Sequence, residues 1–370
     1  MEGYSLTDLR KKNYSDIYRI IYQAKQLSKS QIANALQMSL PTVTQHLLAL
    51  TNDGMIEKRG LLASTIGRKA AAYAICPTLR VSVGVELLQS TVTVVVLDLY
   101  GSVIGKERKA LEFSQQDAYF AALAQTINAL LEAHQIKQEQ VLGCGIGLQC
   151  LTSEDGQEIL YGKVLGCTDL KIDPLQKQLP FPCCFVHDSA CAAALELWRS
   201  PEITDALYIS LGIHLGGAMI ADGKIKPGRN GTFEHMTLVD GGRTCYCGKQ
   251  GCMECYCSAG ALLTDNETLE QFFADLRKGN PQANARWTDY LHWLAMAINN
   301  LHMVVDSPIF LGGHIAPYLL QNDLDILFAQ AQQRTAFPEK DNFLSIGVQE
   351  PDVVALGAAV PFLSDFLASI

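Results

Sequence analysis

The pattern of apolar and polar positions predicts three helices in the first 50 residues. Residues 13–26 place apolar side chains on one helical face, at Ile17, Ile20, Ile21 and Ala24. Ser28 is a favourable capping residue for a second helix, which the pattern extends to Leu36. Ser39 followed by Pro41 suits the start of a third helix, because proline is tolerated in the first turn.

The third helix should separate an apolar face from a polar one. We expect its inward side chains to be Val43, Leu47, Leu48 and Leu50, and its outward ones to be Thr42, Thr44, Gln45 and His46. A short helix, a four-residue turn and a second helix with this polar face are typical of a helix-turn-helix that reads the major groove of DNA. Together with Ser39, these polar residues are the predicted contacts to bases and phosphates. A three-helix packing unit with a polar outer face is the structural alternative.

A predicted β-hairpin follows these helices. Residues 54–59 have the composition of a strand, residues 60–69 that of a loop, and residues 70–75 that of a returning strand. This arrangement resembles the wing of a winged helix. Three basic residues of the hairpin would then meet phosphate or reach the minor groove: Arg59, Arg68 and Lys69.

Beyond residue 80 the pattern changes to strands that alternate with helices. Residues 81–99 form two β-rich runs with a break near Leu88, and residues 102–106 form a third. Helical spacing returns in residues 118–134, and residues 141–148 are an apolar strand. The alternation predicts an α/β fold with mixed sheets. Two further apolar helices are expected at residues 290–304 and 353–367.

Charge divides the chain at the same boundary. The 370 residues have a formal net charge of -9, yet residues 1–76 hold ten lysines and arginines against five acids and so carry +5. The remainder therefore carries -14. A basic head on an acidic body is the asymmetry expected of a DNA-binding module joined to a sensing domain. We expect a DNA-binding domain at residues 1–76 and a sensing domain at residues 81–370.

Hydrophobic residues make up 48% of the chain, which suffices for sizeable cores. No charge-free apolar run is long enough to cross a membrane, and the first residues lack the apolar segment of a signal peptide. We therefore expect a soluble, cytoplasmic protein with no membrane partner.

A cysteine-rich run at residues 231–258, punctuated by glycines, contains a candidate metal site. Three thiolates and one imidazole, a complete tetrahedral set for structural zinc, come from Cys245, Cys247, Cys252 and His235. Four glycines between positions 241 and 251 allow the tight turns that such a site needs. Cys255 and Cys257 could compete as ligands. Reduced thiols or a disulfide are the alternatives to a metal, although cytosolic proteins seldom keep disulfides.

The same run has a family resemblance. The pattern H-x9-C-x-C-G-x2-G-C-x-E, from His235 to Glu254, is similar to the signature of the ROK family of repressors, open reading frames and sugar kinases. The resemblance extends more loosely over residues 81–370. It implies an actin-like ATPase fold of two lobes, zinc in the loop 235–252, and a bound sugar in contact with Glu254. Repressors of the family also share the N-terminal winged helix.

The resemblance also implies a sugar site, in part altered here. Asp188 is retained on a strand-to-helix turn, where it can accept a hydrogen bond from a sugar hydroxyl, although it could instead cap the helix. His187 replaces the usual Asn, Thr232 replaces a Glu, and a new acid precedes the zinc histidine. The predicted ligand residues are Asp188, His187, Glu234, His235 and Glu254. The changes favour an unusual sugar or sugar derivative, and a lost or non-sugar effector is the alternative.

The phosphate loops of the family are altered more strongly. Sugar kinases of the family open the first lobe with D-x-G-G-T, whose glycines admit the nucleotide phosphates. The aligned segment here is Glu86-Leu87-Leu88-Gln89-Ser90, so both glycines are absent. A second phosphate loop, residues 211–217, keeps glycines but inserts Ile213 and His214. Because phosphoryl transfer depends on positioning and charge compensation, we expect no kinase activity.

The sequence thus predicts a DNA-binding transcriptional regulator of carbohydrate metabolism, and in particular a repressor. Its expected partners are operator DNA, a sugar or sugar-derivative effector, and further copies of itself in a dimer or tetramer, because winged helices usually read two half-sites. Two other interpretations stay open. One is a ROK-type sugar kinase with an added N-terminal module, and the other is a zinc-stabilised interaction protein that does not bind DNA.

Overall fold

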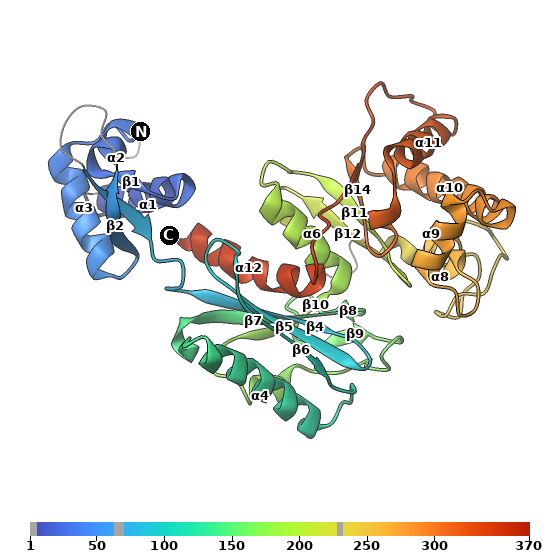
Figure 1. Cartoon of the computed structure of the whole chain (residues 1–370), viewed down its shortest axis with the longest axis horizontal. Coiled ribbons are helices and arrows are strands. Elements are labelled where there is room, and N and C mark those ends of the chain that lie inside the picture. The colour runs from blue at the N-terminus through green and yellow to red at the C-terminus, as the bar shows by residue number, and fades with distance from the viewer. Residues whose placement is uncertain (1–5, 63–69, 228–231) are drawn as a thin grey trace. The chain divides into compact units, whose positions relative to one another are not determined.

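The computed structural model describes residues 6–62, 70–227 and 232–370, and no helix within these ranges is long and apolar enough to cross a membrane. The chain divides into two compact units. The N-terminal unit comprises the chain up to Val81 together with Asp98–Ser102 and Leu363–Ile370. The large unit comprises Ser82–Leu97 and Val103–Phe362 (Figure 1).

Up to Val81, the described part of the N-terminal unit contains three helices and a small sheet. The helices are α1 (Leu6–Ala24), α2 (Lys29–Ala35) and α3 (Leu40–Asn52). The sheet has the order β1-β3-β2, with β1 at Leu27–Ser28, β2 at Ile56–Leu62 and β3 at Ala70–Ile75. β2 and β3 pair antiparallel, which confirms the predicted hairpin. The first helix begins at Leu6 rather than at residue 13.

Side-chain caps fix the start of α2 and of α3. Ser28 and Gln31 form a reciprocal capping box at the start of α2. The Ser39 hydroxyl accepts a hydrogen bond from the Thr42 backbone N–H at 3.3 Å, and Pro41 lies in the first turn of α3. Side chains with no exposed surface join the three helices: Ile17, Ile21, Ile32, Val43 and Leu50. These local signals explain why the sequence pattern located both helices correctly.

One face of α3 differs from the prediction. His46 is buried, with 8% of its surface exposed, whereas Leu48 is 62% exposed. The buried stripe runs from Val43 to the positions three, four and seven residues later, which are His46, Leu47 and Leu50. Leu48 follows Val43 by five residues and so lies on the opposite side of the helix. The predicted outward position of His46 is therefore wrong, and the inward position predicted for Leu48 is wrong as well.

Two five-stranded sheets organise the large unit. The first has the order β10-β7-β4-β5-β6. β4, β5 and β6 pair antiparallel in sequence, whereas β10 and β7 pair parallel, so the sheet is mixed as predicted. The strands are β4 (Val81–Leu87), β5 (Thr91–Leu97), β6 (Val103–Ala110), β7 (Val141–Leu148) and β10 (Cys183–His187). Helix α4 (Asp117–Ala133) covers one face of this sheet in Figure 1.

The second sheet has the order β13-β12-β11-β14-β15. Its strands are β11 (Ala206–Leu211), β12 (Leu215–Ala221), β13 (Lys224–Ile225), β14 (Ile309–Gly312) and β15 (Leu344–Ile346). Helix α6 (Asp188–Arg199) contacts β11 and β12. A helical bundle, orange to red in Figure 1, includes α9 (Leu269–Arg277), α10 (Pro281–His302) and α11 (Gln321–Gln332). α10 starts at Pro281 rather than at residue 290, because Asn280 caps an earlier turn.

The last helix, α12 (Val353–Ser369), approaches the first sheet closely at two glycines. A Cβ atom added at Gly84 of β4 would lie 1.9 Å from the Ala355 carbonyl oxygen. A Cβ atom added at Gly145 of β7 would lie 2.1 Å from the Ala358 carbonyl oxygen. No side chain fits at either position, so glycine permits this contact between helix and sheet.

Candidate metal centre and ligand pocket

The predicted metal loop lies in the large unit, between β13 and α7 (Glu254–Cys257). It contains a single 3-10 turn, at Phe233–His235, and two isolated β-bridges. Three of its glycines adopt positive φ angles: Gly241, Gly248 and Gly251. At Gly251 an added Cβ atom would lie 1.6 Å from the Val239 carbonyl oxygen, so this turn requires glycine. Tight turns thus fold the loop back on itself, as its glycine content predicts.

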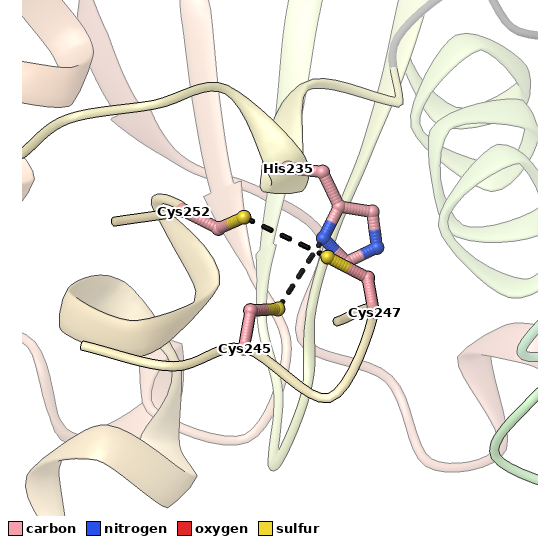
Figure 2. Close-up of side chains that lie close together, drawn as sticks. All are labelled: His235, Cys245, Cys247 and Cys252. Atoms are coloured by element: carbon pink, nitrogen blue, oxygen red, sulfur yellow. Dashed lines mark hydrogen bonds between the residues drawn. The ribbon is translucent and has the colours of Figure 1, made fainter. Parts of the chain in front are cut away.

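Four side chains of the loop converge in Figure 2, namely His235, Cys245, Cys247 and Cys252. Their potential ligand atoms all lie within 4.8 Å of one another. Cys245 Sγ lies 3.6 Å from His235 Nδ1, and Cys247 Sγ lies 3.8 Å from Cys252 Sγ. The structure therefore brings together the four residues that the sequence predicted, and this group could hold a metal ion.

The protonation tendencies of the cluster are set by burial and by hydrogen bonds. Burial lowers the pKa of the His235 imidazole, which favours the neutral form that binds metals. Burial raises the pKa of Cys245 and of Cys252. Burial acts in the same sense on Cys247, but hydrogen bonds from the Lys249 backbone N–H and from the neighbouring thiols outweigh it and lower the pKa. Cys247 is therefore the thiol of the cluster that ionises first.

The two additional cysteines that could compete as ligands lie outside the cluster. Cys257 is completely buried in α7, and Cys255 is half-buried. Within the described ranges, neither belongs to the group of four converging ligand atoms. All twelve cysteines are free thiols in this structure, including the three of the converging group.

A cavity of about 210 Å³ adjoins the metal loop. The predicted ligand residues that line it are His187, Glu234 and His235. The lining residues that the sequence did not predict include Tyr161, Lys163 and Tyr246. Tyr246 had a local signal, because it lies between two predicted metal ligands. Lys163 had none, since it lies 72 residues before His235 in the sequence and belongs to no recognisable motif.

Glu234 is a buried acid at this cavity, with 8% of its surface exposed. Its Oε2 atom has no hydrogen-bond partner among the residues that the structure describes. Burial raises the pKa of Glu234 to about 8, and the carboxylates of Asp188 and Glu254 contribute in the same direction. A buried polar atom costs free energy when it stays unpaired, so this oxygen is suited to a hydrogen bond with a ligand.

The carboxylate of Glu254 is occupied by groups of the chain itself. Its Oε1 atom lies 3.0 Å from His214 Nδ1, and its Oε2 atom accepts a hydrogen bond from the Leu215 backbone N–H at 2.6 Å. Glu254 does not line the described cavity. This predicted ligand residue therefore contacts residues 214 and 215 of the second phosphate loop rather than the cavity.

Asp188 is the first residue of α6 and serves the start of that helix. Its Oδ1 atom accepts a hydrogen bond from the Ser189 backbone N–H at 2.7 Å and lies 3.3 Å from His187 Nε2. His187, not Asp188, occupies the cap position of α6 and makes no side-chain cap hydrogen bond, so Asp188 is not the cap that the alternative supposed. Since His187 lines the cavity, the contact also orients a pocket residue. The Asp188 side chain itself remains 30% exposed.

The segments that the resemblance aligned with the two phosphate loops carry large side chains. The connection between β4 and β5 carries Leu88, which is 44% exposed, where the family motif has glycine. Burial raises the pKa of Glu86, and the nearby carboxylates of Asp352 and Asp188 raise it further. In the second loop His214 bonds to Glu254 and meets the Tyr246 ring edge to face at a centroid distance of 5.0 Å.

The predicted DNA-binding residues of α3 are bonded to different degrees. Ser39 Oγ caps the helix and lies 2.8 Å from Thr42 Oγ1. The Thr44 hydroxyl donates to the Leu40 carbonyl oxygen at 2.6 Å. Gln45 is exposed on the same side of the helix. Of these side chains, Gln45 has the greatest reach towards a base edge.

The predicted basic residues of the wing are only in part described. Arg59 lies in β2 and forms an exposed ion pair with Glu57, with 2.6 Å between Nε and Oε1. Arg68 and Lys69 lie outside the described residues.

Comparison with known proteins agrees with both units. The profile of the ROK family matches residues 82–341, and that of a winged helix-turn-helix DNA-binding domain matches residues 15–57. The DNA-binding transcriptional dual regulator NagC of Escherichia coli (strain K12) is 25% identical over 287 residues, covering 76% of this chain and 69% of its own. A putative xylose repressor of Caldicellulosiruptor sp. (strain Rt8B.4) is 22% identical over 383 residues, covering 95% of each chain. A glucokinase of Halalkalibacterium halodurans is 28% identical over 188 residues, covering 49% of this chain and 57% of its own.

A solved structure extends the likeness to the whole fold. The crystal structure of a ROK family transcriptional regulator, a homologue of the E. coli MLC protein, superposes with a TM-score of 0.75 at 19% identity, covering 97% of this chain and 98% of its own. This confirms the predicted fold class, a winged helix-turn-helix joined to the two-lobed, actin-like ROK fold. With the family profile matching residues 82–341 of the 370, over the sheets and the metal loop alike, the chain belongs to the ROK family.

Proposed function

We propose that this chain is a sugar-responsive transcriptional repressor. A DNA-binding domain at residues 1–76 would read an operator, and a sensing domain at residues 81–370 would bind the effector. The observation that supports this proposal is the combination of a winged helix-turn-helix with a ROK domain that contains a cavity beside the predicted metal loop. The relatives that are repressors or transcriptional regulators support it.

The DNA contact would come from the exposed start of α3 and from the wing. Gln45 is the residue proposed to read a base, because an amide side chain can form two hydrogen bonds with adenine. Ser39, Thr42 and Thr44 would support it with phosphate contacts, as would Arg59, Arg68 and Lys69 of the wing. The charge of +5 on residues 1–76 supplies the electrostatic attraction to the DNA backbone.

The proposed metal is a structural zinc ion held by His235, Cys245, Cys247 and Cys252. Zinc bonds of about 2.3 Å to sulfur and about 2.0 Å to nitrogen in a tetrahedron place two sulfurs about 3.8 Å apart, and a sulfur and a nitrogen about 3.5 Å apart. The corresponding distances here are 3.8 and 3.6 Å. Four protein ligands leave no open position, so the ion would fix the loop and take no part in a reaction.

The same geometry argues against phosphoryl transfer. Leucine and glutamine replace the two glycines of the first phosphate loop, and the bond between His214 and Glu254 fills the second. Without backbone N–H groups free to surround the phosphates, the charge of the transferring group is not compensated. A ROK-type sugar kinase with an added DNA-binding module is the alternative, which the glucokinase relative keeps open.

Regulation would follow from unequal affinity of the effector for two arrangements of the protein. A ligand shifts such an equilibrium only if it binds one arrangement more tightly. We propose that the bound sugar favours the arrangement that fits the operator less well. A cytoplasmic homodimer or tetramer would present two winged helices to a palindromic operator.

The direct test is fluorescence anisotropy of the purified protein on duplex DNA from its own upstream region, with and without a panel of sugars. We expect selective binding that one sugar weakens. Gln45→Ala should weaken binding to the selected site roughly five- to 150-fold, as the loss of about 1–3 kcal/mol of base discrimination implies. The matched variant Gln23→Ala, at an exposed position of α1, should bind normally. Binding without sequence selectivity, together with ADP release from ATP and a hexose, would favour the kinase.

A further inference from the structure

The lining of the ligand pocket includes a lysine, Lys163, as well as the hydrogen-bonding residues Glu234 and His187. We propose that it takes an anionic monosaccharide, whose carboxylate or phosphate pairs with Lys163 while its hydroxyls bond to Glu234 and His187. This inference rests on the proposed function and specifies the chemical class of the effector. Neither the family profile nor the names of the relatives assign a role to Lys163.

Lys163 supplies a positive charge that has no carboxylate partner among the residues that the structure describes. It follows β9 (Ile159–Tyr161), in a segment that runs over the pocket to α5 (Asp173–Gln176). Among the described residues, its Nζ atom contacts the Cys247 carbonyl oxygen at 3.5 Å and lies 5.8 Å from the centre of the Tyr161 ring. No described carboxylate lies within ion-pairing distance. A cation at the edge of a cavity is therefore free to bind an anion.

Glu234 shows independently that the pocket is built for a ligand. The Glu234 residue lines the cavity, and its buried Oε2 atom has no partner among the described residues. A protein that buries such an atom loses free energy unless another molecule completes the hydrogen bond. A sugar hydroxyl fits because it can both donate and accept. His187, positioned by Asp188, offers a second polar contact on the same wall.

The distribution of charge orients the ligand. Acids lie in and beside this pocket: Glu234 lines it, and Asp188 contacts the lining residue His187. An anionic group is therefore disfavoured beside these acids and favoured beside Lys163, so the charged group of the ligand should lie at Lys163 and its hydroxyls at the acids. A sugar acid or a sugar phosphate has this polarity, with its charged group at one end of a polyhydroxylated ring.

The size and the aromatic residues of the pocket fit one sugar ring. A volume of about 210 Å³ is below the roughly 300–1,000 Å³ of sites for drug-sized ligands, so a nucleotide or an oligosaccharide is too large. Tyr161 and Tyr246 line the cavity and offer aromatic faces to the apolar C–H groups of a sugar. The ligand is accordingly a single ring with one charged substituent.

Isothermal titration calorimetry on the zinc-loaded full chain tests this assignment. The probes are glucose, mannose, galactose and N-acetylglucosamine, each beside its 6-phosphate, together with glucuronate, mannuronate and galacturonate. We expect an anionic probe to bind at least about tenfold more tightly than its neutral parent, as a charged hydrogen bond implies. The uronate and phosphate arms distinguish the two sources of charge. Lys163→Gln should abolish the preference and Lys163→Glu should reverse it.

A matched control is Lys177→Gln, at an exposed lysine of the same unit that does not line the pocket. It should keep the preference for the anion. Zinc content is measured in every variant, because Lys163 also contacts the backbone of a proposed metal ligand. Full zinc in Lys163→Gln together with a lost anion preference supports the assignment. Loss of zinc in that variant would make Lys163 a structural residue and overturn it.

Three further outcomes would overturn the inference. They are equal affinity for neutral and anionic members, an unchanged anion preference in Lys163→Gln, and no binding of any probe. The repressor proposal fails separately. If a neutral sugar releases the protein from its operator, the proposed repressor function is supported and the proposed anionic effector is wrong. If the anion preference is found but selective DNA binding is not, the proposed anionic-sugar site is supported and the proposed repressor function is wrong.

Discussion

Two regions of the large unit differ: the cavity with its metal loop, here called the sugar side, and the segments aligned with the phosphate loops, here called the phosphate side. On the sugar side, meaning the cavity and the metal loop 235–252, four potential ligand atoms converge. The buried Oε2 atom of Glu234 has no hydrogen-bond partner among the described residues. On the phosphate side, meaning residues 86–90 and 211–217, Leu88 replaces a glycine and His214 bonds to Glu254. In our proposal, the first region binds the effector, and the second no longer binds nucleotide phosphates.

On the proposed function, a binding function here outlasts a catalytic one. Recognition needs a pocket with matched hydrogen bonds, and it tolerates new residues such as Lys163. Phosphoryl transfer needs several groups in place at once, so the loss of one loop is enough to end it. Glu254 illustrates the change, because a residue that the family resemblance assigns to the sugar here bonds to His214 of the phosphate side.

The largest expected effect is the loss of the metal. Cys252→Ser should reduce zinc content from about one ion per chain to none, because three ligands hold the ion far less tightly than four. The sugar response should be lost with it, since the loop carries Glu234 and Tyr246. Metal analysis and the anisotropy titration measure both effects. Cys255→Ser, just outside the cluster, should retain zinc; if it loses the metal, the assignment of the four ligands is wrong.

The next effect concerns ATP. Wild-type protein should produce no ADP above background with any hexose, and Mg-ATP should leave its melting temperature unchanged. His214→Gly should give the same result, because the first loop still lacks its glycines. A variant that combines His214→Gly with the sequence Asp-Leu-Gly-Gly-Thr at positions 86–90 should acquire a melting shift with Mg-ATP. ADP release by the wild-type chain would contradict the proposal that residues 86–90 and 211–217 no longer bind nucleotide phosphates.

A moderate effect is expected when the contacts of Glu254 with residues 211–217 of the phosphate side are weakened. Glu254→Gln replaces a buried carboxylate that serves both His214 and the Leu215 backbone, and it should lower the free energy of unfolding by about 1–3 kcal/mol. Urea denaturation measures the loss, and zinc content should stay unchanged. Glu350→Gln, at an exposed ion pair with Arg199, is the matched control and should change stability by less than about 1 kcal/mol. Equal losses in the two variants would remove any special role of the His214 contact.

The smallest expected effect concerns the ion pair of Arg286 with Glu267, which belongs to neither the sugar side nor the phosphate side. Hydrogen bonds from Arg286 hold the pKa of Glu267 at about 2, below its ordinary value of 4.5. The charged form of Glu267 therefore stabilises the fold above pH 4.5, and this contribution is lost as the pH falls from 4.5 towards 2. Arg286→Gln should flatten the acid limb of a plot of melting temperature against pH. The sugar response should not change, and a change would show that it depends on general stability.

Elements fixed by neighbouring residues could be predicted from the sequence. Ser28 and Ser39 marked the starts of α2 and α3, and alternation located β4, β5 and β7 within a few residues. The metal cluster belongs to the same class, because its four side chains come from 18 consecutive positions and its glycines leave few ways to fold the loop. Local geometry decides such features, so the sequence contains them.

Only the tertiary structure decided what faces the ligand and what fills the phosphate side. The contact of Lys163 with Cys247 joins positions 84 residues apart, and that of His214 with Glu254 joins positions 40 residues apart. His46 became a core residue because the stripe on α3 packs against other helices, a neighbour relation that polarity alone does not reveal. Sequence spacing determines which side chains a turn or a helix brings together. The side chains that meet across a pocket depend on how distant segments pack.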